Sequence, residues 1–148
     1  MKAIIISGAL AQDHEFIYPF YRVLEEGMEL DVCIIGGKSV QGYFGTALPP
    51  NKDHPVKDIH QVKVEDYDFL ILPGGVKAME KIRQDKKLIN FISDFNKLGK
   101  VIACICSGAQ LLISANVVKG RKIAGYYSMK DDIDGPGWIG YSQHAFET

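Results

Sequence analysis

Four short apolar runs recur along the chain, and each has the length of a strand in a buried sheet. They are KAIIIS (2–7), LDVCIIG (30–36), DFLILPGG (68–75) and KVIACIC (100–106). Within each run the apolar residues are continuous instead of alternating with polar ones, which is typical of a parallel sheet covered on both faces. The pattern therefore predicts a parallel sheet at the centre of the fold.

Amphipathic helical patterns lie between these runs. Residues 13–27 and 86–99 carry apolar side chains at three- and four-residue spacing and end at a glycine, and Asp13 is the candidate N-cap of the first helix. Residues 107–117 are a third candidate helix. Strands that alternate with helices predict a three-layer α/β fold, in which right-handed crossovers place functional loops at the carboxyl ends of the strands.

Two other features shape this prediction. Residues 37–61 interrupt the alternation with glycines and three prolines, which indicates a turn-rich β excursion inside the domain. Pro19, inside the first predicted helix, cannot donate a hydrogen bond to the carbonyl oxygen of Glu15, so we expect an irregular or kinked turn there. That turn lies close to the carboxyl end of the first strand, which makes Glu15 a candidate site residue.

Composition and charge narrow the class of protein. The chain has 148 residues, of which 47% are hydrophobic and 24% charged, as expected for one globular domain spanning residues 1–148. Seventeen basic residues against 18 acidic ones give a net charge of −1, so neither nucleic acid nor an anionic membrane is an expected partner. The sequence shows no secretory signal and no membrane span, and its three cysteines do not form a disulfide framework. These features predict a cytoplasmic protein.

The candidate chemistry is at Cys106, where a strand turns directly into a helix. The segment Ile105-Cys106-Ser107-Gly108 has the order of a nucleophile elbow, in which a sharp turn exposes the nucleophile and a glycine lets helix and strand approach. A helix N-terminus lowers the pKa of a thiol, so we expect an activated Cys106. Cys104 and Cys33 lie inside strands and are interpreted as packing residues.

The glycines of LPGG (72–75) end the neighbouring strand. Backbone N–H groups at Gly74 and Gly75 would suit an incoming oxyanion, and either glycine could lie against a substrate. Glycines at the end of a strand more often only make turns. The motif gains meaning because it is expected to lie beside the candidate nucleophile.

Several motifs together resemble the DJ-1/PfpI superfamily, and above all its PfpI-like intracellular protease and deglycase branch. In order they are DHEFIYP (13–19), LPGG (72–75), CICSGAQLLISANVVKGRKIAGY (104–126) and KDD (130–132). The resemblance implies a flavodoxin-like three-layer sandwich. It also implies that Cys106 is the nucleophile, that Glu15 hydrogen-bonds to its sulfur, and that the backbone N–H groups of Gly75 and Ser107 form the oxyanion hole.

The sequence departs from the family pattern at several positions. Ser107 stands where PfpI-like members have a histidine, so the elbow contains no Cys-His pair. Glu80, which matches an acid that acts through that histidine, is therefore expected to be a surface or interface residue. Two other side chains are candidate substrate contacts: His14, next to Glu15, and Tyr126, which stands near where some relatives have a histidine.

The C-terminal end also departs from the family. After KDD the family continues through a strand and a helix, whereas this chain runs IDGPGWIGYSQHAFET and stops. We expect the usual strand and helix to be absent. Either Trp138, Tyr141 and Phe146 cover the exposed face, or a partner subunit does, or the sequence is truncated.

The leading functional hypothesis is a cysteine-dependent enzyme that acts on a carbonyl carbon. The thiolate of Cys106 would add to glyoxal, methylglyoxal or their adducts while Glu15 passes protons, a chemistry that needs no histidine to protonate an amine leaving group. Neither a cofactor nor a metal is expected, since no nucleotide-binding glycine motif and no metal-ligand spacing is present. Family resemblance implies a homodimer or a larger homo-oligomer.

Two alternatives remain open at this stage. One is a cysteine peptidase or amidase that takes a glycated or peptide substrate, including a glutamine amidotransferase, because CICSGAQ contains a C-x-G-x-Q elbow. Amidotransferases need a downstream His-x-Glu pair, and the candidates here, His144 and Glu147, have two residues between them. The other is a non-enzymatic redox sensor or chaperone in which Cys106 oxidises to sulfinic acid. A low-pKa thiol would serve either chemistry.

Overall fold

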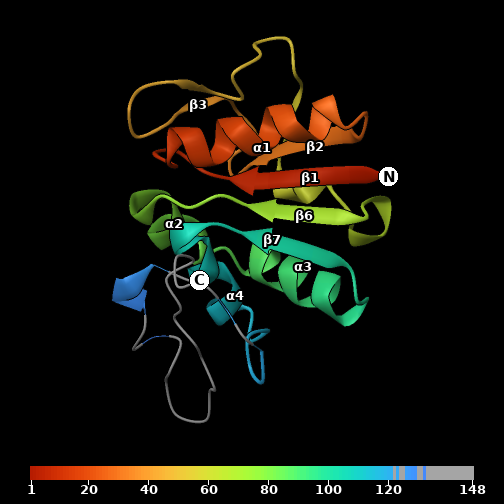
Figure 1. Ribbon diagram of the computed structural model, residues 1–148, viewed down its shortest axis with the longest axis vertical. Coiled ribbons are helices and arrows are strands. Elements are labelled where there is room, and N and C mark those ends of the chain that lie inside the picture. The colour runs from red at the N-terminus through yellow and green to blue at the C-terminus, as the bar shows by residue number, and fades with distance from the viewer. Residues whose placement is uncertain (122, 124–125, 130–131, 133–148) are drawn as a thin grey trace, which may run out of the picture.

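The structure is a computed structural model that describes residues 1–121, 123, 126–129 and 132. At its centre is a parallel sheet of five strands in the order β5-β2-β1-β6-β7 (Figure 1). These strands are β1 (Lys2–Ser7), β2 (Glu29–Ile34), β5 (Val56–Lys57), β6 (Phe69–Leu72) and β7 (Val101–Cys104). The predicted parallel sheet is confirmed, and it contains a fifth strand, β5, that the sequence did not predict.

Four α-helices in the described part of the chain connect or flank the strands: α1 (Asp13–Glu25), α2 (Val76–Ile82), α3 (Lys86–Lys97) and α4 (Ala109–Ser114). Short 3₁₀ turns occur at Ile59–Gln61, Val64–Asp66, Cys106–Gly108 and Tyr127–Met129. The segment predicted as a helix over residues 107–117 therefore forms a 3₁₀ turn followed by a shorter helix. No helix within the described ranges has the length and apolar character to cross a membrane.

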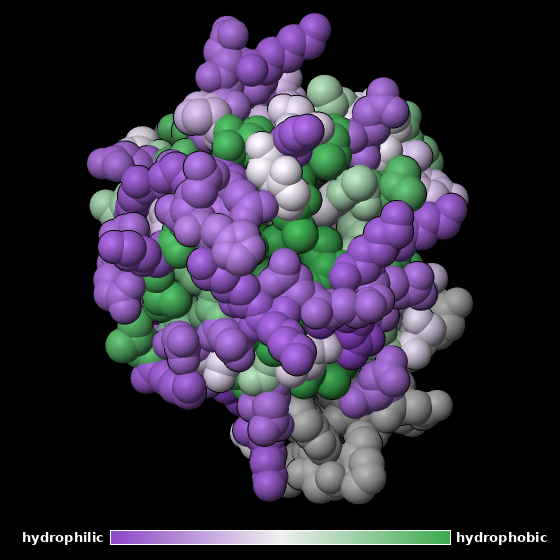
Figure 2. Space-filling view, turned by 180° about the vertical axis from the view of Figure 1, so that it is seen from behind, coloured by the Kyte–Doolittle hydropathy of each residue, from purple (hydrophilic) through white to green (hydrophobic). Residues whose placement is uncertain are grey.

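The strand order explains how the helices form two outer layers. From β1 the chain moves first to β2 on one side and later to β6 and β7 on the other. Right-handed crossovers then place α1 on one face of the sheet and α3 on the opposite face. Figure 1 shows α1 crossing in front of β1 and β2, and the opposite face, seen in Figure 2, is largely hydrophilic with apolar atoms between the charged side chains. This is the predicted flavodoxin-like α/β sandwich.

The core lies between these layers and follows the apolar pattern of the sequence. The side chains of Ala3 to Ile6 in β1 are fully buried, as are Phe16 and Phe20 on the inner face of α1. Phe95 is the corresponding fully buried aromatic residue of α3. Because β1 is covered on both faces, its apolar residues are continuous, as the sequence predicted.

Residues 37–61 contain two elements that the sequence did not resolve. A hairpin is formed by β3 (Val40–Gln41) and β4 (Ala47–Leu48), and β5 then joins the edge of the main sheet beside β2. Both elements have two-residue strands, too short to give a periodic signal. The predicted β excursion is confirmed, but part of it belongs to the central sheet.

Asp13 is not the N-cap of α1, which corrects the sequence prediction. The cap position is Gln12, which makes no side-chain capping bond, and Asp13 is the first helical residue. Its buried carboxylate accepts hydrogen bonds from the backbone N–H groups of Phe44 (2.7 Å) and Thr46 (2.9 Å). A Cβ at Gly42 would lie 2.5 Å from this carboxyl group, so the hairpin can close over it only with glycine there. Asp13 thus fixes the hairpin to the start of α1.

The charge of Asp13 makes this anchor pH-dependent. Burial alone would raise the pKa of Asp13, but the N–H donors of Phe44 and Thr46 outweigh it and lower the pKa below its ordinary value. A carboxyl group with a lowered folded-state pKa contributes stability above its unfolded pKa, and this contribution is lost as the pH falls through the folded value.

We therefore expect Asp13→Asn to lower the free energy of unfolding by about 2 kcal/mol at neutral pH, since hydrogen bonds to a charged acceptor are lost. The deficit should shrink below roughly pH 4, where Asp13 of the unfolded chain begins to be protonated while that of the folded wild type is still charged. Urea unfolding of both proteins at neutral and acidic pH measures the two differences. An equal deficit at both pH values would show that the charge of Asp13 does not stabilise the hairpin.

Candidate active site at the carboxyl edge of the sheet

The backbone at Cys106 has the geometry of a nucleophile elbow. Ile105 is still extended, Cys106 has φ of 52°, and a 3₁₀ turn begins immediately. A positive φ is uncommon for a residue with a side chain, and it occurs where the surrounding structure imposes it. Gly108 completes the turn: a Cβ there would lie 2.4 Å from the carbonyl oxygen of Leu72, so only glycine lets the turn lie against β6. The predicted elbow is present.

Glu15 is brought to the elbow by a hydrogen bond from the end of β6. The backbone N–H of Gly74 donates to Oε2 of Glu15 at 2.8 Å. A Cβ on Gly74 would lie 2.5 Å from this oxygen and 3.0 Å from Cβ of Cys106. The Glu15 carboxyl group and the Cys106 side chain therefore both lie directly against Gly74. α1 continues through Pro19 to Glu25, so the expected irregularity does not break the helix.

Gly75 adopts a conformation that favours glycine, with φ of 106°, and precedes α2. A Cβ there would meet the backbone N of Gln12 at 2.5 Å. Ser107 is buried beside Cys106, and its backbone N–H is directed at the sulfur atom. Gly75 and Ser107, the two residues expected to supply oxyanion donors, both line the cavity next to Cys106.

A cavity of about 280 Å³ opens in front of this group. In the described part of the chain it is lined by Gln12, Glu15, Gly75, Val76, Cys106, Ser107, Gln110, Tyr126, Ser128 and Met129. Glu15 is the only one of these with an acidic or basic side chain. The cavity therefore presents a thiol, a carboxyl group and several neutral hydrogen-bonding groups to whatever enters it.

The pKa of Cys106 corrects one expectation. Burial raises the pKa of the thiol above its ordinary value, and the Glu15 carboxylate raises it further by its charge and by accepting a hydrogen bond from the thiol. The N–H and hydroxyl of Ser107 lower it, but by less. The prediction of a lowered pKa is wrong because α4 has only six residues, too short for its dipole to outweigh burial and a neighbouring negative charge.

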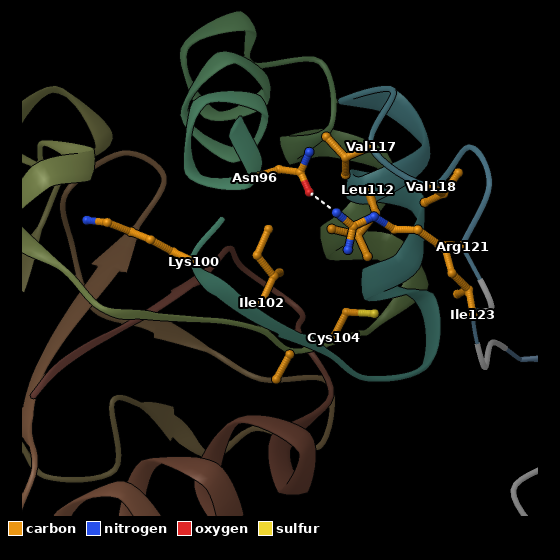
Figure 3. A pocket seen from close by; sticks show the side chains of 10 residues that line it. Asn96, Lys100, Ile102, Cys104, Leu112, Val117, Val118, Arg121 and Ile123 are labelled. Atoms are coloured by element: carbon orange, nitrogen blue, oxygen red, sulfur yellow. Dashed lines mark hydrogen bonds between the residues drawn. The ribbon is translucent and has the colours of Figure 1, made fainter. Parts of the chain in front are cut away.

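The other two cysteines are packing residues, as predicted. Burial raises the pKa of Cys33 to about 12 and that of Cys104 to about 11. Cys104 reaches a different cavity, of about 360 Å³, which Figure 3 shows between β7, α3 and α4. Most of the side chains that line it are apolar, and its Arg121 donates a hydrogen bond to Asn96 at 2.8 Å. No carboxyl group or histidine among the described residues lines it, and the ammonium group of its Lys100 donates to the backbone carbonyl oxygen of Val64.

The remaining candidates divide between the cavity and the surface. Tyr126 lines the Cys106 cavity and is half exposed. His14 does not line it. This side chain is exposed and lies in a separate groove with Tyr18 and Phe44. Glu80 is exposed on α2, consistent with a surface residue.

No histidine among the described residues lies in the cavity. His54 packs against the ring of Phe20, with centroids 5.0 Å apart, and His60 lies next to Asp58 and Lys87. His144 and Glu147, the candidate amidotransferase pair, lie outside the described residues, as do Trp138, Tyr141 and Phe146. The described residues also contain no cluster of side chains that could hold a metal ion.

Comparison with known proteins identifies the family to which this site belongs. The model of the DJ-1/PfpI family matches residues 1–145. The chain belongs to the DJ-1/PfpI family. "Deglycase PfpI" of Pyrococcus furiosus is 34% identical over 141 residues, covering 94% of this chain and 81% of the relative. "Protein/nucleic acid deglycase 2" of Escherichia coli is 34% identical over 144 residues, covering 97% and 80%.

Solved structures of the DJ-1/PfpI type share the fold. Drosophila melanogaster DJ-1beta superposes with a TM-score of 0.83 at 21% identity, covering 97% of this chain and 74% of that one. Schizosaccharomyces pombe DJ-1 gives a TM-score of 0.81 at 16% identity. The predicted family and fold are both confirmed.

Sequence reasoning missed five residues that line the DJ-1/PfpI cavity: Gln12, Val76, Gln110, Ser128 and Met129. Gln110 carried a signal, because it is the last residue of the C-x-G-x-Q pattern and lies one helical turn after Cys106. Val76 begins α2, a helix that the sequence did not predict, and Ser128 and Met129 follow the elbow helix in a 3₁₀ turn. Their place in the cavity depends on tertiary structure.

Replacing Glu15 with Gln tests the electrostatic origin of the raised Cys106 pKa. The substitution removes the negative charge but keeps an oxygen that can accept the Gly74 N–H bond. We expect the pKa of Cys106 to fall and alkylation by iodoacetamide at neutral pH to become about three- to tenfold faster. Mass spectrometry of the labelled peptide gives the rate at Cys106, with Cys104 in the same protein as internal reference. Slower labelling of Cys106 would show instead that Glu15 donates a proton to a thiolate.

Proposed function

We propose that this protein is a cysteine-dependent enzyme that acts on the carbonyl carbon of small 2-oxoaldehydes and of the adducts that they form with amines and thiols. The observation that carries this proposal is the placement of the Cys106 thiol and the Glu15 carboxyl group against Gly74, beside a small cavity that both residues line. The names of relatives such as "Deglycase PfpI" support the same class of reaction.

The raised pKa of Cys106 assigns Glu15 its role in this reaction. A thiol with a raised pKa is protonated at neutral pH, and a protonated thiol is a poor nucleophile. It becomes reactive when an adjacent base removes its proton as the sulfur attacks. Glu15 is the acidic residue among the described residues lining the cavity, and it already interacts with the thiol, so we assign it as the general base.

With methylglyoxal the steps balance without an external oxidant or reductant. The sulfur of Cys106 forms a bond to the aldehyde carbon while Glu15 takes the thiol proton and passes it to the carbonyl oxygen, which gives an enzyme-bound hemithioacetal. Glu15 next moves the hydrogen of that carbon, as a proton, to the adjacent ketone carbon, and a thioester of lactate results. Water hydrolyses the thioester and restores the thiol.

The oxyanion that forms during attack needs hydrogen-bond donors. We propose that the backbone N–H groups of Gly75 and Ser107 supply them, because both residues line the cavity with Cys106 and the Ser107 N–H lies at its sulfur. Donors fixed in place before the reaction stabilise developing charge without reorganisation. A hemiaminal has no carbonyl at this carbon, so there the sulfur displaces the amine: the carbon–sulfur bond forms as the carbon–nitrogen bond breaks, and Glu15 passes the thiol proton to the leaving nitrogen. The product is the same enzyme-bound hemithioacetal.

The other hypotheses receive less support from the cavity. A peptidase must protonate an amine that leaves from an unactivated amide, and no histidine among the described residues lines the cavity. A redox sensor oxidises through its thiolate, which the raised pKa of Cys106 disfavours. We retain the expectation that residues 1–148 act as one domain of a cytoplasmic homo-oligomer.

Turnover of methylglyoxal tests the proposal. We expect Cys106→Ser and Glu15→Gln each to reduce lactate formation by at least about 100-fold, the usual contribution of a nucleophile or general base. Cys104→Ser, which alters a thiol outside the cavity, should change the rate less than about twofold. Lactate is measured in a buffer without amines, because amines bind the aldehyde. Unchanged turnover in Cys106→Ser would exclude the proposed reaction.

Glu15→Gln separates two effects of Glu15: proton removal during the reaction, and the raising of the Cys106 pKa, which sets the fraction of thiolate. If Glu15 is the base, this variant alkylates faster at Cys106 but turns over slowly. Alkylation and turnover that rise together would instead show that Glu15 only suppresses the nucleophile, and would contradict its assignment as the general base.

A further inference from the structure

Gln110, which lines the Cys106 cavity, has an unusual side-chain oxygen. Its side-chain oxygen Oε1 is shielded from solvent, yet it has no hydrogen-bond partner within the described part of the chain. The other shielded polar atoms of this kind are in Ser7, His54 and Ser107, and of these only Ser107 shares the cavity. An acceptor kept from water and from protein donors costs free energy, so it needs an explanation.

The position of Gln110 supplies one. It lies one helical turn after Cys106, at the start of α4, and lines the same cavity as the thiol and Glu15. Ser107 lies beside the sulfur of Cys106, and its N–H and hydroxyl lower the pKa of the thiol, so the sulfur accounts for its shielded oxygen. Gln110 has no role in the proton transfers described above. It is therefore available to contact a part of the substrate other than the reacting carbon.

The chemistry of the cavity limits what that part can be. An amide oxygen accepts a hydrogen bond, so its partner must carry an N–H or O–H group. No basic side chain lines the cavity among the described residues, and Glu15 adds negative charge, so an anionic group is disfavoured. A neutral amine-derived or amide N–H next to the electrophilic carbon meets both conditions.

We propose that Gln110 is a specificity-determining residue that accepts a hydrogen bond from an N–H group one or two bonds from the carbon attacked by Cys106. This selects nitrogen-linked adducts of 2-oxoaldehydes over sulfur-linked ones, which lack that N–H. The inference rests on the proposed function and names its substrate preference. Because Oε1 has no hydrogen-bond partner among the described residues, a turn of the carboxamide toward the substrate gains a bond without breaking one that they supply.

A pair of alkylating reagents tests this contact without requiring turnover. Iodoacetamide carries an N–H donor two bonds from the carbon that Cys106 attacks, whereas methyl iodoacetate has a similar shape and no such donor. The measured quantity is the ratio of the two alkylation rates at Cys106, followed by mass spectrometry and divided by the same ratio for free N-acetylcysteine. Thiolate fraction cancels in this ratio, since both reagents meet the same thiol at the same pH.

In the wild-type protein the normalised ratio should exceed one. Gln110→Met, which keeps the length of the side chain and removes the oxygen, should lower it by about three- to tenfold, the range that one neutral hydrogen bond provides. Gln110→Glu keeps an acceptor oxygen and should preserve the ratio even if both absolute rates fall. Gln84→Met, at an exposed glutamine that donates to the carbonyl oxygen of Glu80, is the matched control and should leave the ratio unchanged.

The outcomes distinguish this inference from the proposed function. An unchanged ratio in Gln110→Met, or an equal loss in Gln110→Glu, would overturn the role of Gln110 while leaving the carbonyl chemistry intact. The expected fall in the ratio combined with methylglyoxal turnover that does not need Cys106 would support the contact and contradict the proposed reaction. A Cys106 that neither reagent labels in the wild type would contradict both.

Discussion

The close approach of three backbone segments at Gly74 is the constraint on which the site depends. Gly74 ends β6, and its N–H holds the carboxyl group of Glu15 from α1, while the elbow after β7 packs against its other side. The site lies between β1 and β6, from which the chain continues to opposite edges of the sheet. In open parallel sheets, ligand-binding and catalytic sites usually lie at this point. Any side chain at Gly74 would separate the carboxyl group from the thiol.

This packing also sets the chemistry of the thiol. Enclosing Cys106 raises its pKa through burial, and bringing Glu15 close raises it again through charge. In the proposed reaction, the same contact that makes the thiol less acidic would supply the base that removes its proton. A site of this kind keeps its nucleophile protonated until a substrate arrives, which also limits unwanted oxidation of the thiol.

Much of the fold and part of the site could be predicted because they depend on local sequence. Continuous apolar runs predicted strands β1, β2, β6 and β7, and the small residues after Cys106 predicted the elbow. What could not be predicted depends on contacts between distant segments. Asp13 resembled a helix cap, but its partners come from the hairpin some 30 residues later. The pKa of Cys106 was misjudged because burial and the charge of Glu15 arise only in the folded chain.

The central claim is that Cys106 of the resting protein is a protonated thiol beside a carboxylate. The most direct test is a pH titration of thiolate absorbance in the ultraviolet, taken as the difference between the wild type and Cys106→Ser. The predicted result is a thiolate that appears only above the ordinary cysteine pKa of about 8.5. A thiolate already present at slightly acidic pH would contradict the claim, and would mean that the proton of the pair resides on Glu15.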